Sequence, residues 1–216
     1  MEERLIRHIN NLVDRYPMLS VCSEDIAKAY SILEDAYSAG RKLLVSGNGG
    51  SASDSEHIVG ELMKEFKLKR KVYAGQAEAM KAIDSEMGAT LAENLQGALP
   101  AISLTAHSSL QTAFMNDVVP ELVFAQQVNG YGMPGDVYLG ISTSGNSKNV
   151  LYAAITAKAR GLKVIGLTGK TENRLMRYAD VCIRVPETET YKIQELHLPV
   201  YHCLCLMLEE SFFGKV

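Results

Sequence analysis

The sequence predicts an α/β protein, with a five-stranded parallel sheet flanked by helices, an N-terminal helical extension and a long C-terminal helix. Helical patterns of apolar residues, such as 109–128 and 149–161, alternate with short apolar runs. Short buried strands that alternate with helices are typical of a parallel sheet covered on both faces. The five runs of strand length lie at residues 42–47, 101–106, 136–143, 163–169 and 180–186.

Helices are expected at both ends of the chain. Residues 1–39 repeat apolar side chains at helical spacing, and Pro17 should divide them into two helices because proline breaks the hydrogen-bond ladder. Residues 189–213 have a long helical pattern, in which Pro199 predicts a kink. The sequence has no linker, internal repeat or low-complexity segment, so residues 1–216 are predicted to form a single domain.

Composition narrows the class of protein. The 216 residues are 47% apolar, which is enough for one sizeable core. A net charge of −3 gives no broad basic surface, so nucleic acid is not expected as a partner. The four cysteines form no C-x-x-C pair, which indicates free thiols in a reducing compartment. The N-terminus is charged and no apolar run approaches about 20 residues, so we expect a cytoplasmic protein without a membrane partner.

Two polar loops follow predicted strands and lead into helices: "SGNGGSAS" at 46–53 and "STSGNS" at 142–147. Helix N-termini bind anions through free N–H groups, and glycine lets the backbone approach a ligand closely. Serine and glycine can also simply cap helices. Two such loops in one sheet favour a phosphate site, although neither has the P-loop or dinucleotide spacing. Its main contacts would be Ser142, Thr143, Ser144 and Ser147.

Ionisable residues lie on helices beside these loops. His57 and Glu61 are four residues apart and share one helix face, as in helical metal sites or in ordinary solvated pairs. Further on, "IQELHLPVYH" contains Gln194 and His202, about 12 Å apart along an ideal helix. They would reach one ion only from opposite sides or from different subunits. A buried core histidine is the alternative interpretation of His202.

Together these motifs resemble the sugar isomerase (SIS) domain, and within it the phosphoheptose isomerases. "GISTSGNS" marks SIS domains in general, whereas H-x-x-x-E combined with I-Q-E-x-H-x-x-x-x-H is more specific. The resemblance covers about residues 5–71 and 98–213. It implies an aldose–ketose isomerase that converts sedoheptulose 7-phosphate to D-glycero-D-manno-heptose 7-phosphate through an enediol.

The resemblance also implies roles for individual residues. Glu61 and His202 would be the acid–base pair, and a zinc ion would be held by His57, Glu61, Gln194 and His202. The family forms homotetramers with active sites between subunits, built partly by N-terminal helices. The implied substrate contacts are Asn48, Gly49, Gly50, Ser51, Asn116, Asp117, Ser142, Thr143, Ser144, Ser147 and Gln194.

The chain also departs from the family pattern. Residues 72–97 are an insertion with helical composition, which would form either a lid over the pocket or a plain surface excursion. Glu65 stands where the family often has arginine, and Tyr191 where it often has aspartate. Isomerisation of another sugar phosphate therefore remains an alternative. So does a non-catalytic regulator or adaptor that binds sugar phosphate, although relatives of that kind lose the histidine found here as His202.

Overall fold

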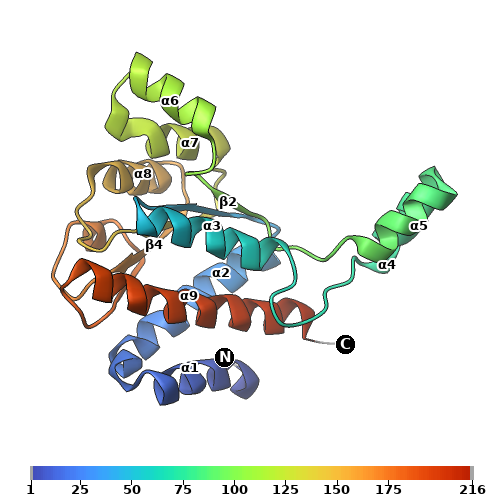
Figure 1. The fold of residues 1–216 in the computed structure, drawn as a ribbon, viewed down its shortest axis with the longest axis horizontal. Helices are drawn as coiled ribbons and strands as arrows, with labels where there is room; N and C mark the ends of the chain where they lie inside the picture. The colour runs from blue at the N-terminus through green and yellow to red at the C-terminus, as the bar shows by residue number, and fades with distance from the viewer. Residues whose placement is uncertain (1, 215–216) are drawn as a thin grey trace.

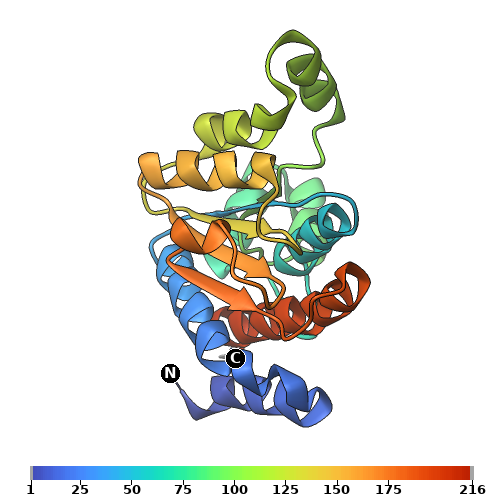
Figure 2. The same ribbon diagram turned by 90° about the vertical axis from the view of Figure 1, so that its left-hand side faces the viewer.

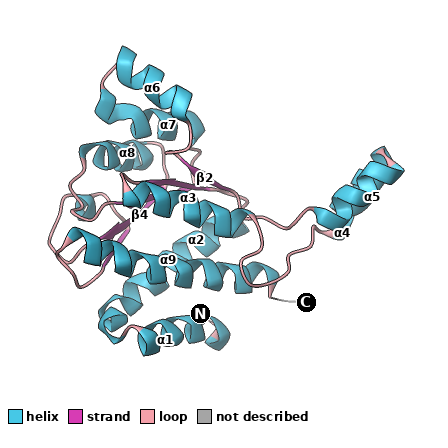
Figure 3. Ribbon diagram, viewed as in Figure 1, coloured by secondary structure: helices cyan, strands magenta, loops and turns pink. Residues whose placement is uncertain are grey.

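A five-stranded parallel sheet lies between two layers of helices (Figures 1 and 3). The computed structural model describes residues 2–214, so Met1 and residues 215–216 of the predicted domain lie outside it. The strand order is β2-β1-β3-β4-β5, and every neighbouring pair is parallel, as predicted. The strands are β1 (Leu43–Ser46), β2 (Ala101–Ser103), β3 (Val137–Ile141), β4 (Lys163–Thr168) and β5 (Val181–Arg184).

Helices cover both faces of the sheet (Figure 2). Leu44, Tyr138 and Val164 face a core under α7 and α8, while alternate residues of the same strands face a larger core under α1, α2 and α9. The helices are α1 (Glu3–Arg15), α2 (Ser23–Ser38), α3 (Gly50–Met63), α4 (Ala74–Ile83), α5 (Ser85–Asn94), α6 (Ser108–Asp117), α7 (Val123–Tyr131), α8 (Lys148–Ala159) and α9 (Thr190–Phe213). Short 3-10 turns span Pro17–Cys22, Pro120–Leu122 and Leu175–Arg177.

Three prolines act differently on the predicted helices. Pro17 begins a 3-10 turn between α1 and α2, so the predicted division is confirmed. Pro120 divides the predicted helix 109–128 into α6 and α7, a break that the sequence pattern did not predict, because the residue before a proline is forced into an extended conformation. Pro199 lies inside α9 without dividing it. Within residues 2–214 no helix combines the length and the apolar character that crossing a membrane requires.

A buried ion pair fastens the end of α3 to α9. Glu209 of α9 accepts hydrogen bonds from the backbone N–H groups of residues 66–68, at 2.9–3.1 Å, and from Arg70 Nε at 2.8 Å. Arg70 also donates to the carbonyl oxygens of Glu61 and Leu62, which are the free carbonyls at the end of α3. Burial raises the pKa of Glu209, but the backbone donors of Phe66 and Lys67 and then the charge of Arg70 outweigh it, so the pKa is lowered.

Replacing Glu209 by glutamine should therefore destabilise the fold. The amide would leave Arg70 buried without a counter-charge, and breaking a buried pair costs about 3 kcal/mol or more. The measurement is the free energy of unfolding from urea titration. Glu189→Gln is the matched control, because Glu189 forms an exposed pair with Lys192 and should lose no more than about 0.5 kcal/mol. Equal losses in the two variants would contradict this account of the pair.

His197 of α9 is fully buried, and neither ring nitrogen makes a hydrogen bond of normal geometry within the described residues. Burial lowers its pKa from 6.5 to about 4, and the nearby backbone of Thr168 only partly opposes this shift. His197 is therefore neutral in the folded protein at pH 7. In the unfolded chain it would take up a proton at a higher pH than in the folded protein.

His197 should make the fold sensitive to mild acid. Its folded pKa lies below its unfolded pKa, so its contribution to stability is complete above pH 6.5 and is lost as the pH falls toward 4. The free energy of unfolding should therefore fall by about 3 kcal/mol across that pH window. Urea titrations of the wild type and His197→Gln between pH 7 and pH 4.5 would test this. The free energy of unfolding of the variant should vary much less over that range, and parallel curves would refute the assignment.

Candidate active site

Two loops meet where the strand order of the sheet reverses. β2 lies on one side of β1 and β3 on the other, so the loops after β1 and β3 leave the same edge side by side. The side-chain amides of Asn48 in the first loop and Asn149 in the first turn of α8, just after the second loop, hold the two together: each donates to the oxygen of the other, at 3.0 and 2.8 Å. The loops 46–53 and 142–147 therefore form one polar surface at the carboxyl end of the sheet.

Glycines shape the first loop. Gly49 has φ 56° and ψ −120°, a conformation that glycine adopts far more readily than other residues. A side chain at Gly50 would come within 2.5 Å of the Gln194 side-chain nitrogen, so α9 packs directly on this loop. Ser51 is buried in the first turn of α3. Five predicted substrate contacts, Asn48, Gly49, Gly50, Ser51 and Gln194, thus lie at one place.

The second loop is held by its own polar groups. Ser142 and Ser147 share a hydrogen bond of 3.0 Å between their hydroxyls, and Ser147 directly precedes α8. Gly145 has φ +62°, and a Cβ there would come within 2.2 Å of the Asn173 side chain. The loop thus presents hydroxyls at a helix N-terminus, which suits an anion. It holds the four predicted phosphate contacts Ser142, Thr143, Ser144 and Ser147.

Three ionisable side chains converge where α3 packs on α9. His57 and Glu61 lie one turn apart on α3, with His57 Nε2 3.1 Å from Glu61 Oε1. His202 comes from α9, and its Nε2 lies 3.5 Å from His57 Nε2. The tertiary structure therefore brings His202 to the pair from a second helix. Gln194 contacts the first loop instead, and no described contact joins it to these three side chains.

Two further side chains orient His57, and the sequence analysis did not identify them. The Tyr201 hydroxyl donates to Asp54 Oδ1 at 3.2 Å, so it accepts a hydrogen bond from His57 Nδ1 at 3.0 Å. With its proton on Nδ1, a neutral His57 has an acceptor at Nε2, so its 3.1 Å contact with Glu61 Oε1 is a hydrogen bond only when a proton lies between these two atoms. Burial raises the pKa of Asp54, and its hydrogen bond with Tyr201 partly offsets this. One available signal was that Asp54 lies one turn before His57 on α3.

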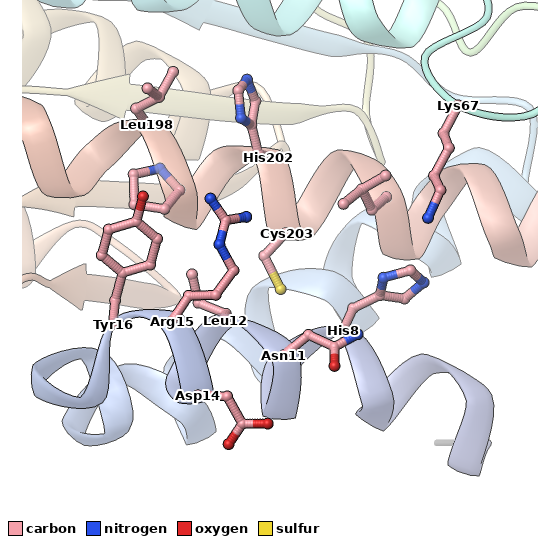
Figure 4. A pocket seen from close by; sticks show the side chains of 12 residues that line it. His8, Asn11, Leu12, Asp14, Arg15, Tyr16, Lys67, Leu198, His202 and Cys203 are labelled. Carbon is pink, nitrogen blue, oxygen red and sulfur yellow. The ribbon is translucent and has the colours of Figure 1, made fainter.

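Burial and charge set the proton affinity of this cluster. The pKa of His202 is lowered by burial, by His57 and by the guanidinium of Arg15, which points toward it from α1 (Figure 4), while Glu61 opposes the shift. His202 is therefore neutral near pH 7 and able to accept a proton. Glu61 is only 9% exposed, and its Oε2 has no hydrogen-bond partner within residues 2–214. Lys64 lies 3.8 Å from that oxygen and supplies a nearby positive charge.

The donor atoms of the cluster suit zinc in type. Imidazole nitrogens and a carboxylate are zinc ligands, and 3.1 and 3.5 Å are close to the about 3.3 Å between neighbouring ligand atoms of a tetrahedral zinc ion. Within the described residues, however, no group of three His, Cys, Asp or Glu side chains is arranged to hold a metal ion. A complete site would need a further ligand, and the predicted one, Gln194, contacts the first loop.

Two predicted substrate contacts lie elsewhere. Asn116 and Asp117 are exposed at the end of α6, where Asn116 Nδ2 donates to Asp117 Oδ1 at 2.9 Å. In Figure 1, α6 lies on the far side of α7 and α8 from α9. No described contact joins the two residues to the other predicted site residues. Their predicted role would therefore require another copy of the chain or a movement of α6.

Comparisons with known proteins identify the family. A model of the SIS domain matches residues 109–207. The chain is 34% identical to a phosphoheptose isomerase of Akkermansia muciniphila, over 99% of this chain and 100% of the relative. This chain belongs to the phosphoheptose isomerase family. A phosphoheptose isomerase of Geotalea daltonii is 39% identical and is aligned over 89% of this chain and 87% of its own length.

Solved structures of phosphoheptose isomerases have the same fold. That from Neisseria gonorrhoeae has a TM-score of 0.72 at 30% identity, covering 96% of this chain and 98% of its own. That from Francisella tularensis has a TM-score of 0.74 at 29% identity, covering 96% of this chain and 97% of its own. The predicted fold and the family resemblance are therefore both confirmed.

The geometry of the second loop should make Gly145 sensitive to substitution. Gly145→Ala would force a Cβ into a positive-φ position against Asn173, at a cost of about 1–3 kcal/mol. Gly130→Ala on α7 is the matched control, because nothing lies within 4 Å of its added Cβ; it should be neutral or stabilise by up to about 1 kcal/mol. Urea denaturation measures both. An unchanged Gly145→Ala would mean that the loop is not constrained as described.

Proposed function

We propose that this chain is a cytoplasmic sugar-phosphate isomerase that converts sedoheptulose 7-phosphate to D-glycero-D-manno-heptose 7-phosphate. The observation that carries the proposal is the meeting of Glu61 and His202 at His57, beside the two polar loops. Membership of the phosphoheptose isomerase family supports the reaction and the class of substrate. Four free cysteines within residues 2–214 support a reducing compartment.

The proposed chemistry is proton transfer between adjacent carbons through an enediol. In the ketose, a base removes a proton from C1 and returns it to C2, while a second group moves a proton between the two oxygens. Glu61 is suited to transfer the proton between C1 and C2, because it is buried and its Oε2 has no hydrogen-bond partner in the described chain. His202 is suited to transfer the proton between the two substrate oxygens, because its lowered pKa keeps the ring neutral near pH 7.

The two loops would hold the other end of the substrate. Ser142, Thr143, Ser144 and Ser147 would bind the phosphate, while Asn48, Gly49, Gly50, Ser51 and Gln194 would contact the sugar. The helix N-termini of α3 and α8 support this role, because they supply N–H donors and a positive dipole end beside the hydroxyls. Gln194 packs on Gly50, so it lies beside the first loop.

Zinc binding by His57, Glu61, Gln194 and His202 is part of the proposal. When bound, zinc would polarise the carbonyl oxygen of the substrate. The Tyr201–Asp54 chain supports this, because it holds the His57 ring with Nε2 available as a ligand. A carboxylate bound to zinc is a weaker base, so Glu61 would act as the base only when it is free of the metal.

A homotetramer with active sites between copies is also proposed. The position of Asn116 and Asp117 supports it, because without a movement of α6 these residues would reach a substrate only in another copy of the chain. Static light scattering on a gel-filtration column measures the molar mass directly. A monomer with full activity would remove both the assembly and the substrate role of Asn116 and Asp117.

Isomerisation of another sugar phosphate is the second candidate. Glu65 and Tyr191 favour it, because both differ from the family pattern near the site. Tyr191 is exposed at the start of α9, three residues before Gln194. Such a change would alter the selectivity for the sugar while the acid–base pair stays in place.

The deciding experiment is turnover by the purified protein, with and without added zinc, on ketose phosphates of five to seven carbons. Zinc content is measured on the same preparations by elemental analysis. Preference for the seven-carbon ketose supports the proposal. Equal or better turnover of a shorter ketose would replace the substrate, and no turnover at any zinc level would leave a sugar-phosphate-binding regulator as the function.

Variants of the acid–base pair should lose most of their turnover. Glu61→Gln and His202→Ala should each lower kcat by at least about 100-fold, because each removes a proton-transfer group. Steady-state kinetics on the best ketose phosphate measures the effect. Glu24→Gln is the matched control, since Glu24 lies in an exposed pair with Lys28 on α2 and should leave kcat unchanged. Near-normal rates in both site variants would eliminate the mechanism.

A further inference from the structure

Residues 73–95 form a helical hairpin of α4 and α5 that stands off from the body of the protein (Figure 1). Its base is closed by an antiparallel bridge between Lys71 and Gln96 and by a hydrogen bond of 3.1 Å from Gly97 N to the Arg70 carbonyl oxygen. Within the described chain, the two helices pack chiefly on each other. The helical hairpin is thus attached firmly at one end and free along its length.

The turn of the helical hairpin is well defined, although it encloses no apolar core. Asp84 accepts hydrogen bonds from the backbone N–H groups of Glu86 and Met87, at 3.0 and 2.8 Å, and so caps α5. Gly88 is the one buried residue of α4 and α5, and a Cβ there would lie 2.2 Å from the Met80 carbonyl oxygen. The two backbones therefore touch, and the larger side chains point outward.

Apolar side chains form an exposed stripe along this helical hairpin. Met87 is 66% exposed, Leu91 45% and Leu95 44%, and their four-residue spacing places them along one side of α5 and its C-terminal end. Ile83, the last residue of α4, is 87% exposed beside the turn. Helices of ten residues are marginal in water without packing. A contiguous exposed apolar stripe of this kind marks an interaction surface.

A groove of complementary character runs between α1 and α9 and has a volume of about 600 Å³. Its walls carry the cationic side chains Arg15 and Lys67 together with His8 and His202, as Figure 4 shows. Asp14, the one acidic residue of its lining, points away from the groove in Figure 4. The apolar part of the lining comes from Leu12, Leu198, Pro199, Cys203 and Leu206.

The two surfaces match in polarity and charge. Residues 73–95 carry four carboxylates and one lysine, a net charge of −3, around the apolar stripe. The groove presents apolar side chains with cations at its edge. In Figure 1 the helical hairpin projects away from α1 and the groove of its own chain, so the matching surface that can enter this groove is that of a second copy. Reciprocal exchange between two copies gives a closed, two-fold arrangement.

We propose that the helical hairpin of one copy seats its apolar stripe in the groove between α1 and α9 of a second copy. His202 lines that groove, so the partner's helical hairpin would cover the open side of the cluster formed by His57, Glu61 and His202. The contact rests on the proposed assembly of copies and names a surface for it, and its test does not depend on turnover. If the protein turned over no sugar phosphate, this contact would still stand or fall by the experiment below.

Disulfide trapping between differently tagged copies tests the contact. One copy carries Met87→Cys and the other Leu198→Cys, and the two are mixed and oxidised. The expected result is a covalent dimer that contains both tags. Met87→Cys mixed with Tyr152→Cys is the control, because Tyr152 is exposed on α8 away from the groove. Absence of the mixed dimer would overturn the proposal, as would an equal yield of mixed dimer from Met87→Cys with Tyr152→Cys.

A second measurement addresses the strength of the contact. Met87→Asp should raise the dissociation constant of the assembly at least about 10-fold, because a charge would enter the apolar contact, and sedimentation equilibrium measures it. Ala89→Asp is the matched control: Ala89 is exposed and lies about 200° round α5 from Met87. Equal effects from the two variants, or no effect from Met87→Asp, would contradict the proposed seating.

Discussion

The buried pair of Arg70 and Glu209 is the constraint on which the rest of the site depends. Glu209 is fixed on α9, while Arg70 holds the last carbonyls of α3, including that of Glu61. Two charges removed from water are tolerated only when every donor and acceptor is paired, so this contact permits little sliding of one helix on the other. The distance between Glu61 and His202 is thereby set several residues away from either side chain.

The same contact directs the chain that follows α3. Residues 66–68 donate their backbone N–H groups to Glu209, and this turns the chain toward the base of the helical hairpin. The pair of Arg70 and Glu209 therefore positions the proton-transfer residues together with the end of α3 and the start of the helical hairpin. His202 lies between the cluster and the groove, so the proposed contact between copies and the proposed chemistry share one side chain.

Parallel topology places the ligand-binding loops independently of this contact. The strand order reverses beside β1, so the backbone topology alone brings the loops after β1 and β3 together, whichever side chains they carry. The Asn48–Asn149 pair then fixes their separation. Gln194 lies at the junction of the two systems, because its side chain packs on Gly50 while α9 continues to His202.

The sequence by itself determined the sheet, the loops at its carboxyl end and the face shared by His57 and Glu61, because strand runs and helical spacing are local properties. The family resemblance assigned His202 to the same site, whereas only the tertiary structure showed the contact itself and the roles of Tyr201 and Asp54, because these hydrogen bonds join different helices. The tertiary structure also showed that the predicted helix 109–128 is two helices and that α6 lies apart from the cluster. Proline geometry and packing overrode the helical pattern there. The exposure of the stripe on α5 is likewise a tertiary property, because spacing alone does not show which apolar faces remain uncovered.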